Sequence, residues 1–143
     1  VLCMGNSLVH VPGEEAVRFV ADASSVIVSG GWLLLQILNY ELLFRREVAE
    51  LPVLRAEDGV IEFRRRYVWE GPRKVRFQTA LRIAEGDEPR IFRNEIPLYP
   101  LYPEELWETL SGEGYVPIRY YGDFACSDFT PESEALVCLA RKS

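Results

Sequence analysis

A nearly unbroken apolar segment runs from Trp32 to Leu38, and Gln36 is its one polar residue. It follows the Gly30-Gly31 pair and stops at Asn39. This composition is typical of a strand in a parallel sheet with helices on both faces, so we expect both faces of 32–38 to be buried. Ligands of such sheets bind beyond the carboxyl ends of the strands, which makes Asn39 and Tyr40 candidates for a binding site.

The first 31 residues predict a strand, a loop and a helix. Val1–Met4 is a short apolar segment that we expect to be a buried strand, and 5–8 is the loop that leaves it. Pro12 and Gly13 begin a helix whose inward face is formed by Ala16, Phe19, Val20 and Ala23. Strand, helix and strand in this order indicate a right-handed parallel crossover within one sheet.

After Asn39 the hydrophobic period changes. Residues 40–51 predict a short amphipathic helix, and from Val60 three segments alternate with period two. They predict a three-stranded antiparallel meander over about 60–99, with turns at 70–72 and 85–87. One face is apolar and aromatic. The opposite face would show Arg64, Arg66, Arg76 and Arg82.

The last third predicts one helix and two strands. The helix begins at Pro103, turns Leu106, Trp107 and Leu110 inward, and ends at Gly112 and Gly114. Strands are expected at 115–121 and 134–140, and the second is apolar throughout and must be buried. The whole pattern predicts an α/β fold.

Composition indicates one soluble domain, with 48% hydrophobic and 12% aromatic residues in 143. We see no membrane span and no signal segment, and therefore expect a cytoplasmic setting. Cys3, Cys126 and Cys138 have no C-x-x-C spacing, so we expect reduced thiols and no metal. The net charge of −6 argues against nucleic acid as a partner, although residues 60–93 are locally basic and one element there could hold a small anion.

The order of these elements resembles the C-terminal half of a class I S-adenosylmethionine-dependent methyltransferase. Val1–Leu8 is similar to the family's fourth strand and the loop after it, and Val26–Leu33 to its glycine-rich approach to the fifth strand. Tyr102–Leu106 resembles the start of its last helix. Asn39-Tyr40 and Tyr121–Phe124 are most similar to stretches of the glycine and sarcosine N-methyltransferases, which also carry a β insertion after the fifth strand.

The resemblance implies a Rossmann-like sheet, mostly parallel with an antiparallel last strand, and S-adenosylmethionine as cofactor. It also implies that residues 1–143 are the C-terminal part of one domain. The family's cofactor-binding half would precede Val1, because the only Gly-x-Gly here, 112–114, follows a helix. We expect the chain to be inactive alone. Two positions depart from the family: Ser29 replaces a proline, and Leu38 stands where the glycine enzyme has an arginine.

The resemblance also supplies candidate site residues. Asn6, Ser7 and Leu8 would lie near the methionine end of the cofactor, although this sequence is also ordinary turn chemistry. Asn39 and Tyr40 would contact the substrate, or Asn39 would merely end a strand. An arginine of the meander could clamp a carboxylate, unless these charges form a solvated face. The candidates are Arg64, Arg66 and Arg76. Tyr121 and Asp123 would close the pocket, or Asp123 would only form a Gly-Asp turn.

The expected function is methyl transfer to a small molecule, with an amine as the expected acceptor. His10, the sole histidine, would act as a general base or would only be a residue of the loop that leads into the helix. The alternative is a non-enzymatic module that binds a small ligand or assists assembly, and association of several copies stays open. A cysteine or serine hydrolase is disfavoured, because no orienting acid accompanies His10.

Overall fold

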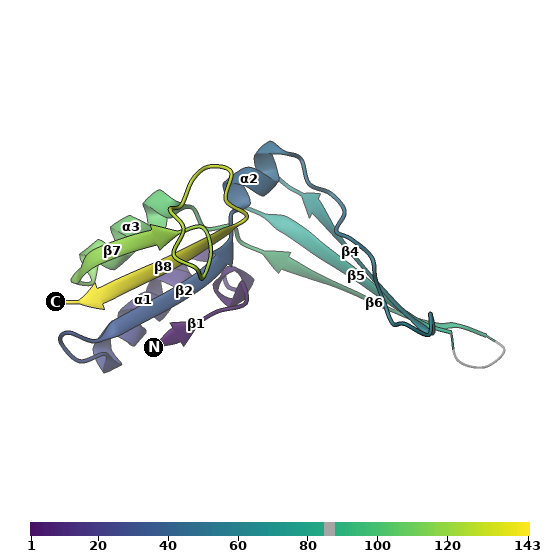
Figure 1. Ribbon diagram of the computed structural model, residues 1–143, viewed down its shortest axis with the longest axis horizontal. Helices are drawn as coiled ribbons and strands as arrows, with labels where there is room; N and C mark the ends of the chain where they lie inside the picture. Colours follow the sequence, from purple (N-terminus) through teal and green to yellow (C-terminus); the bar gives the residue numbers. More distant parts are fainter. Residues whose placement is uncertain (85–87) are drawn as a thin grey trace.

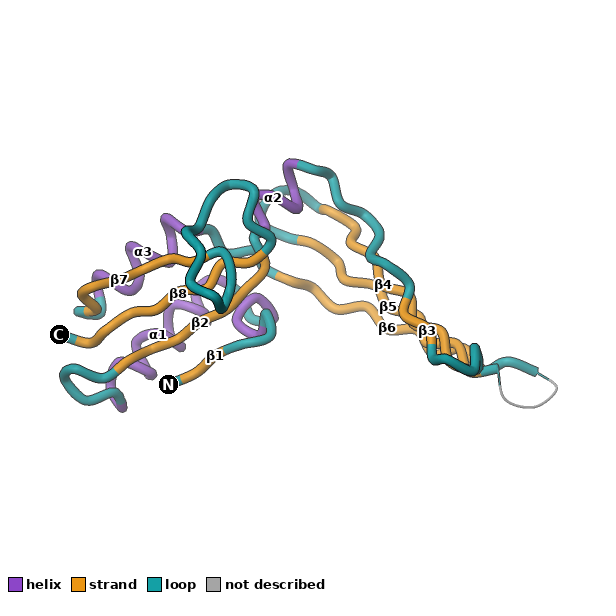
Figure 2. Tube along the Cα trace, viewed as in Figure 1, coloured by secondary structure: helices purple, strands orange, loops and turns teal. Residues whose placement is uncertain are grey.

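The computed structural model describes residues 1–84 and 88–143, so the turn expected at 85–87 lies outside the described residues. Two four-stranded sheets meet at an angle, and the second projects away from the first as a long arm (Figure 1). The first sheet has the order β1-β2-β8-β7 and the second β3-β4-β5-β6. Figure 2 shows that all helices accompany the first sheet or its junction with the arm.

The first sheet confirms the predicted α/β arrangement. Its strands are β1 (Leu2–Cys3), β2 (Trp32–Leu38), β7 (Tyr115–Tyr121) and β8 (Ala135–Lys142). β1 is parallel to β2, whereas β8 is antiparallel to both β2 and β7. Three strands therefore point the same way, and the last strand lies reversed between two of them. This is the predicted sheet with an antiparallel last strand.

Burial of β2 differs from the prediction, because the described helices cover one face of the sheet. α1 (Gly13–Val26) and α3 (Pro103–Gly112) both lie behind the sheet in Figure 1. Leu33, Leu35 and Ile37 are buried, whereas Leu34, Gln36 and Leu38 on the other face are only half-buried and Trp32 is 46% exposed. The expectation that both faces are covered is therefore wrong for this structure.

The first strand also differs from its prediction. β1 contains two residues and pairs only with β2, at the edge of the described sheet. Leu2 is 71% exposed and Val1 47%, so the expected burial of 1–4 is wrong here. A short helix, η1 (Ser7–His10), follows the loop, and its Leu8 and Val9 enter the core.

The two long helices use most of the predicted inward positions. Ala16, Val20 and Ala23 of α1 and Leu106 and Leu110 of α3 are buried. Trp107 was predicted inward but is 47% exposed, with its ring edge-on to Tyr120. Helix α3 stops at Gly112, and Gly114 has a φ of 80°, so the Gly-x-Gly is a helix stop as predicted.

The helix after Asn39 is shorter than predicted. α2 spans Tyr40–Arg45, and Glu47 has a φ of 49°, which ends the helical path. The chain then runs beside the arm: the amide of Tyr67 donates to the carbonyl of Ala49 at 2.7 Å, and that of Leu51 to the carbonyl of Arg65 at 3.1 Å. The prediction of a helix to residue 51 was wrong because these backbone groups pair with a strand.

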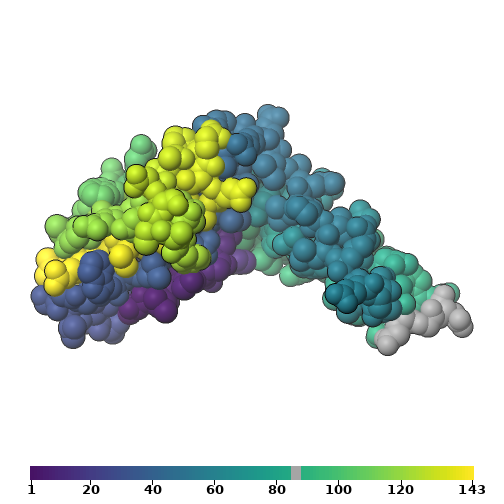
Figure 3. All heavy atoms as spheres, viewed as in Figure 1, coloured from purple at the N-terminus to yellow at the C-terminus, as the bar shows by residue number. Residues whose placement is uncertain are grey.

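The arm contains the predicted meander of β4 (Ile61–Trp69), β5 (Val75–Ile83) and β6 (Arg90–Leu98). β4 pairs with β5 and β5 with β6, both antiparallel and in continuous register. A further short strand, β3 (Leu54–Arg55), pairs with β4 and was not predicted from the sequence. The space-filling view shows the arm extending beyond the body of the molecule (Figure 3).

Aromatic side chains join the arm to the first sheet. The ring of Trp69 lies 6.5 Å from that of Tyr40 and 5.3 Å from that of Phe44, measured between centroids. The indole nitrogen of Trp69 donates to the carbonyl of Val48 at 2.8 Å. Arg73, in the turn between β4 and β5, pairs with Glu105 of α3. The base of the arm is therefore fixed to the body by packing and by an ion pair.

Candidate functional site

The loop that leaves β1 is tied to the carboxyl end of β2. Asn6 has a left-handed backbone, with φ 63°. Its side-chain nitrogen donates to the hydroxyl of Tyr40 at 2.7 Å, and its side-chain oxygen accepts from the backbone N–H of Leu38 at 3.0 Å. Asparagine tolerates this backbone conformation and offers both a donor and an acceptor. The predicted cofactor residue Asn6 and the predicted substrate residue Tyr40 are thus in direct contact.

The other candidates near this loop have different surroundings. The hydroxyl of Ser7 donates to the carbonyl of Met4 at 2.7 Å and is exposed, whereas Leu8 is 4% exposed and belongs to the core. His10 is exposed, and its imidazole makes no hydrogen bond or ion pair with any residue described. A Cβ at Gly5 would meet nothing within 4 Å, so the backbone here is open to an approaching group.

Asn39 is buried at the start of α2, and its side chain connects this helix to another segment. Its side-chain oxygen accepts from the N–H of Leu42 at 3.3 Å, which caps the helix. Its side-chain nitrogen donates to the carbonyl of Ser133 at 2.8 Å and lies 3.4 Å from that of Pro131. The residue is 3% exposed. Each polar atom of the side chain therefore already has a partner within the fold.

Tyr40 is buried as well. It is 1% exposed and packs edge-on to Trp69. Burial raises the pKa of its hydroxyl, although the hydrogen bond from Asn6 acts in the opposite direction. The phenol therefore keeps its proton at neutral pH, and this proton is a donor that the contact with Asn6 does not use.

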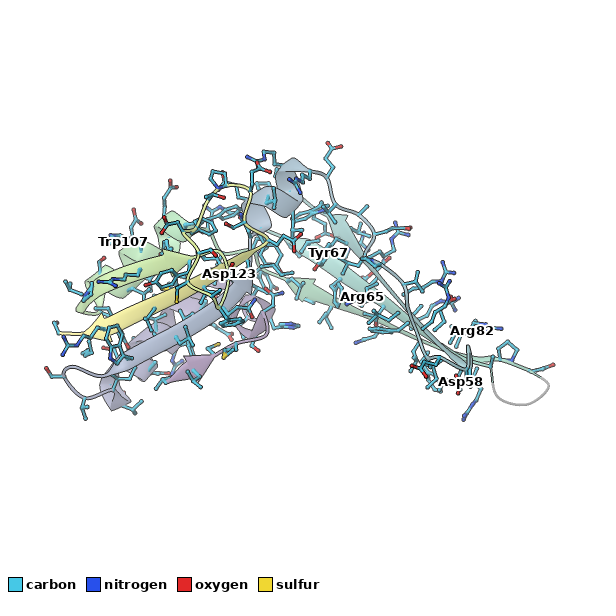
Figure 4. The ribbon with its side chains drawn as sticks, viewed as in Figure 1. Asp58, Arg65, Tyr67, Arg82, Trp107 and Asp123 are labelled. Carbon is cyan, nitrogen blue, oxygen red and sulfur yellow. The ribbon has the colours of Figure 1, made fainter. Side chains whose placement is uncertain are left out.

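Tyr121 and Asp123 lie where the loop 122–134 leaves β7. Tyr121 is half-buried and pairs with Val137 of β8. The carboxylate of Asp123 accepts from the N–H groups of Ala125 at 2.8 Å and Ser127 at 3.1 Å, and hydrogen bonding to Ser127 and Ala125 lowers its pKa. Figure 4 places Asp123 in this loop, in front of the first sheet. Asp123 thus holds its own turn in shape.

The arginine candidates lie on the arm and not beside the loop after β1. Arg64 and Arg66 line a hollow of about 580 Å³ on the arm. Arg76 lies next to it and pairs with Glu70 and Glu95. In Figure 4 the labelled Arg65 and Arg82 mark the course of the arm, with Arg82 toward its far end. The structure therefore divides the predicted site residues into two groups.

Sequence reasoning missed Gln36 as a site residue. Its side-chain oxygen accepts from the N–H of Gly5 at 2.8 Å, and its carbonyl accepts from the N–H of Asn6 at 3.2 Å. The available signal was its position as the one polar residue in the apolar segment 32–38. Trp69 was missed because nothing in the sequence shows that the arm folds back onto Tyr40.

Within residues 1–84 and 88–143, no three His, Cys, Asp or Glu side chains are placed to hold a metal ion. No helix in this part of the chain has the length and apolar composition needed to cross a bilayer.

Comparison with protein-family models and with curated proteins finds no match. Solved structures do match. A S-adenosylmethionine-dependent methyltransferase from Clostridium acetobutylicum superposes with a TM-score of 0.77 at 12% identity, covering 99% of this chain and 57% of that one. The CcbJ methyltransferase from Streptomyces caelestis gives a TM-score of 0.75 at 21% identity, covering 100% and 60%.

A third match is CalS10, an amino pentose methyltransferase from Micromonospora echinaspora, with a TM-score of 0.71 at 18% identity. The match covers 99% of this chain and 57% of the CalS10 chain. In all three cases the chain spans less than two thirds of the matching protein. The 143 residues therefore have the fold of one part of a class I S-adenosylmethionine-dependent methyltransferase.

Proposed function

We propose that these residues are the C-terminal part of a methyltransferase domain that transfers a methyl group from S-adenosylmethionine to an amine of a small molecule. The observation that carries the proposal is the match of nearly the whole chain, arm included, to methyltransferases at TM-scores above 0.7. The amine is supported by the amino pentose methyltransferase among these structures and by the resemblance of Asn39-Tyr40 and Tyr121–Phe124 to the glycine and sarcosine N-methyltransferases.

The residues after β1 fit the edge of such a cofactor site. Gly5 leaves its backbone open, and the exposed hydroxyl oxygen of Ser7 can accept a hydrogen bond. Asn6 has both side-chain groups engaged, and Leu8 is buried, so these two would support the site from behind. When bound, the cofactor supplies an electrophilic methyl group on a sulfonium.

The chain's own contribution is to position the reacting amine and to exclude water. Methyl transfer by in-line displacement needs a neutral amine held against the methyl group in a dry pocket, and it needs no catalytic acid. The hydrogen bonds of Asn6 and Gln36 fix the loop against β2, and Tyr40 with Trp69 forms an apolar support behind it. Asn6 and Tyr40 are therefore positioning residues in this proposal.

Calorimetry with S-adenosylhomocysteine tests the proposal in the protein that contains these residues. Saturable binding is expected, and an absence of heat at millimolar ligand would remove the proposal. In the variant Tyr40→Phe, Asn6 loses its acceptor, and we expect binding to weaken several-fold, since such a hydrogen bond contributes about 1 kcal/mol. The control Tyr120→Phe loses its own hydrogen bond to the carbonyl of Pro103 but keeps the contact between Asn6 and Tyr40. Equal affinities of the two variants would show that Tyr40 is not part of the site.

A non-enzymatic binding module remains the second candidate. The hollow on the arm favours it, because that hollow lies apart from the loop after β1. Failure of cofactor binding together with binding of a ligand on the arm would select this second function.

A further inference from the structure

The hollow on the arm opens on the polar face of the meander. In register across the three strands, Arg64, Ala80 and Arg93 form one row, and Arg66, Gln78 and Glu95 form the next. Residues in register share a face of a sheet. All six line the hollow, and the row between them, formed by Arg65, Thr79 and Asn94, contributes to its lining as well.

Ala80 makes room for a ligand. It lies in the central strand between two arginines, so its methyl group forms a low floor with long side chains on either side. β4 and β6 are about 10 Å apart, since neighbouring strands are separated by about 4.8 Å. Arginine side chains that rise from these two strands can therefore reach a common group above Ala80. The volume of about 580 Å³ lies within the range of small-molecule sites.

The charges around the floor are incompletely balanced. The guanidinium groups of Arg66 and Arg93 have no ion-pair or hydrogen-bond partner among the residues described, and Arg64 pairs with Glu62 at 2.6 Å. Glu95 is already occupied, because Gln78 donates to it and Arg76 lies 3.4 Å away. Glu50 is the other acidic residue of the lining. The carboxylate of Glu50 has no ion-pair partner among the described residues either. The unpaired charges are thus two guanidinium groups and one carboxylate, an excess of positive charge, and guanidinium groups bind oxyanions through two parallel hydrogen bonds.

We propose that this hollow binds a small molecule through an oxyanion, either a phosphate or a carboxylate, held by Arg66 and Arg93 over Ala80. Gln78 would hold Glu95 aside and keep its carboxylate from competing. This site goes beyond the proposed methyl transfer and does not depend on it, since its lining residues come from the arm and the segment beside it and include none from the loop after β1.

Calorimetric titration of the protein with inorganic pyrophosphate and, separately, with citrate tests the proposal. The ionic strength is held near 0.15 M with sodium chloride, which screens diffuse attraction beyond about 8 Å. Binding of pyrophosphate alone assigns a phosphate, binding of citrate alone a carboxylate, and binding of both a general oxyanion site. Absence of saturable binding for both probes overturns the proposal.

Substitutions show where on the protein the oxyanion binds. Arg66→Gln with Arg93→Gln should weaken it at least ~10-fold, because hydrogen bonds to charged groups contribute about 1.5 kcal/mol or more. Ala80→Leu should weaken it without changing the charge, by filling the floor, and keeps the test valid if the double variant does not fold. Arg119→Gln, an exposed strand arginine of the first sheet, is the matched control. Equal affinity in all variants overturns the proposal.

Discussion

Single side chains fix the geometry where the two sheets meet. Asn6 connects the loop after β1 to Leu38 and Tyr40, and Asn39 connects α2 to the loop 122–134. Both asparagines use their donor and their acceptor within the fold. A buried amide with all groups satisfied gives rigidity, and the loss of one partner leaves another polar group unpaired. Asn6 and Asn39 therefore affect a binding site by fixing the segments on which its residues lie.

At the residue scale, Asn39→Ala should lower the free energy of unfolding by about 1–2 kcal/mol, the usual cost of losing a helix cap. The carbonyls of Ser133 and Pro131 lose their donor as well. Denaturant unfolding followed by circular dichroism measures the change. Asn94→Ala on exposed β6 is the control, expected within ~0.5 kcal/mol of the parent. Equal stability of both variants would show that Asn39 is dispensable for the fold.

At the scale of elements, the approach to β2 depends on a close packing of backbone and side chains. The Gly30-Gly31 turn brings the chain from α1 into the strand, and the N–H of Gly31 donates to the carbonyl of Val28 at 2.9 Å. A Cβ built at Gly31 would lie 2.7 Å from the side chain of Ile27 and 2.9 Å from the same carbonyl. Only glycine fits here without movement of the backbone.

Gly31→Ala should therefore destabilise the protein by about 1–3 kcal/mol, the range for an overpacked position. Gly13→Ala is the matched control, because its Cβ would meet nothing within 4 Å and it lies in the first turn of α1. That control should be neutral or more stable by up to ~1 kcal/mol, from the lower chain entropy of alanine. Thermal melting compares the two, and a tolerated Gly31→Ala would show that the turn can shift.

At the scale of the whole molecule, buried phenols connect stability to pH. Burial raises the pKa values of Tyr40, Tyr67, Tyr115 and Tyr120. These residues come from the first sheet, the junction and the arm, so their burial depends on every part of the fold. Each has to stay neutral while it is buried.

The folded protein therefore retains these protons at a pH where the unfolded chain, with tyrosine pKa values of about 10, loses them. Stability from this source is present below about pH 10 and falls as the pH rises further. Urea unfolding at pH 8 and pH 11 should show the loss, and Tyr40→Phe should reduce it. A stability that stays constant over this range would contradict the burial of the phenols.

Local sequence pattern was enough to predict the elements whose hydrophobic period is clear. The helical faces of 13–26 and 103–112, the strand 32–38 and the alternation of the meander all follow from local pattern, because each element must bury one face. The order of elements and the local motifs gave the methyltransferase resemblance, and the structural matches confirm that fold. The choice of Asn6, Tyr40, Arg64 and Arg66 as candidates also came from the sequence alone.

Tertiary structure decided what contacts these elements make. It cut the helix after Asn39 at Arg45, because residues 49–51 pair with β4, and it left Leu2, Trp32 and Trp107 exposed. It joined Asn6 to Tyr40 across 34 positions of sequence and set Arg66 and Arg93 around Ala80. Local pattern reports which face of an element is apolar, but the partner of that face is fixed only when distant segments pack together.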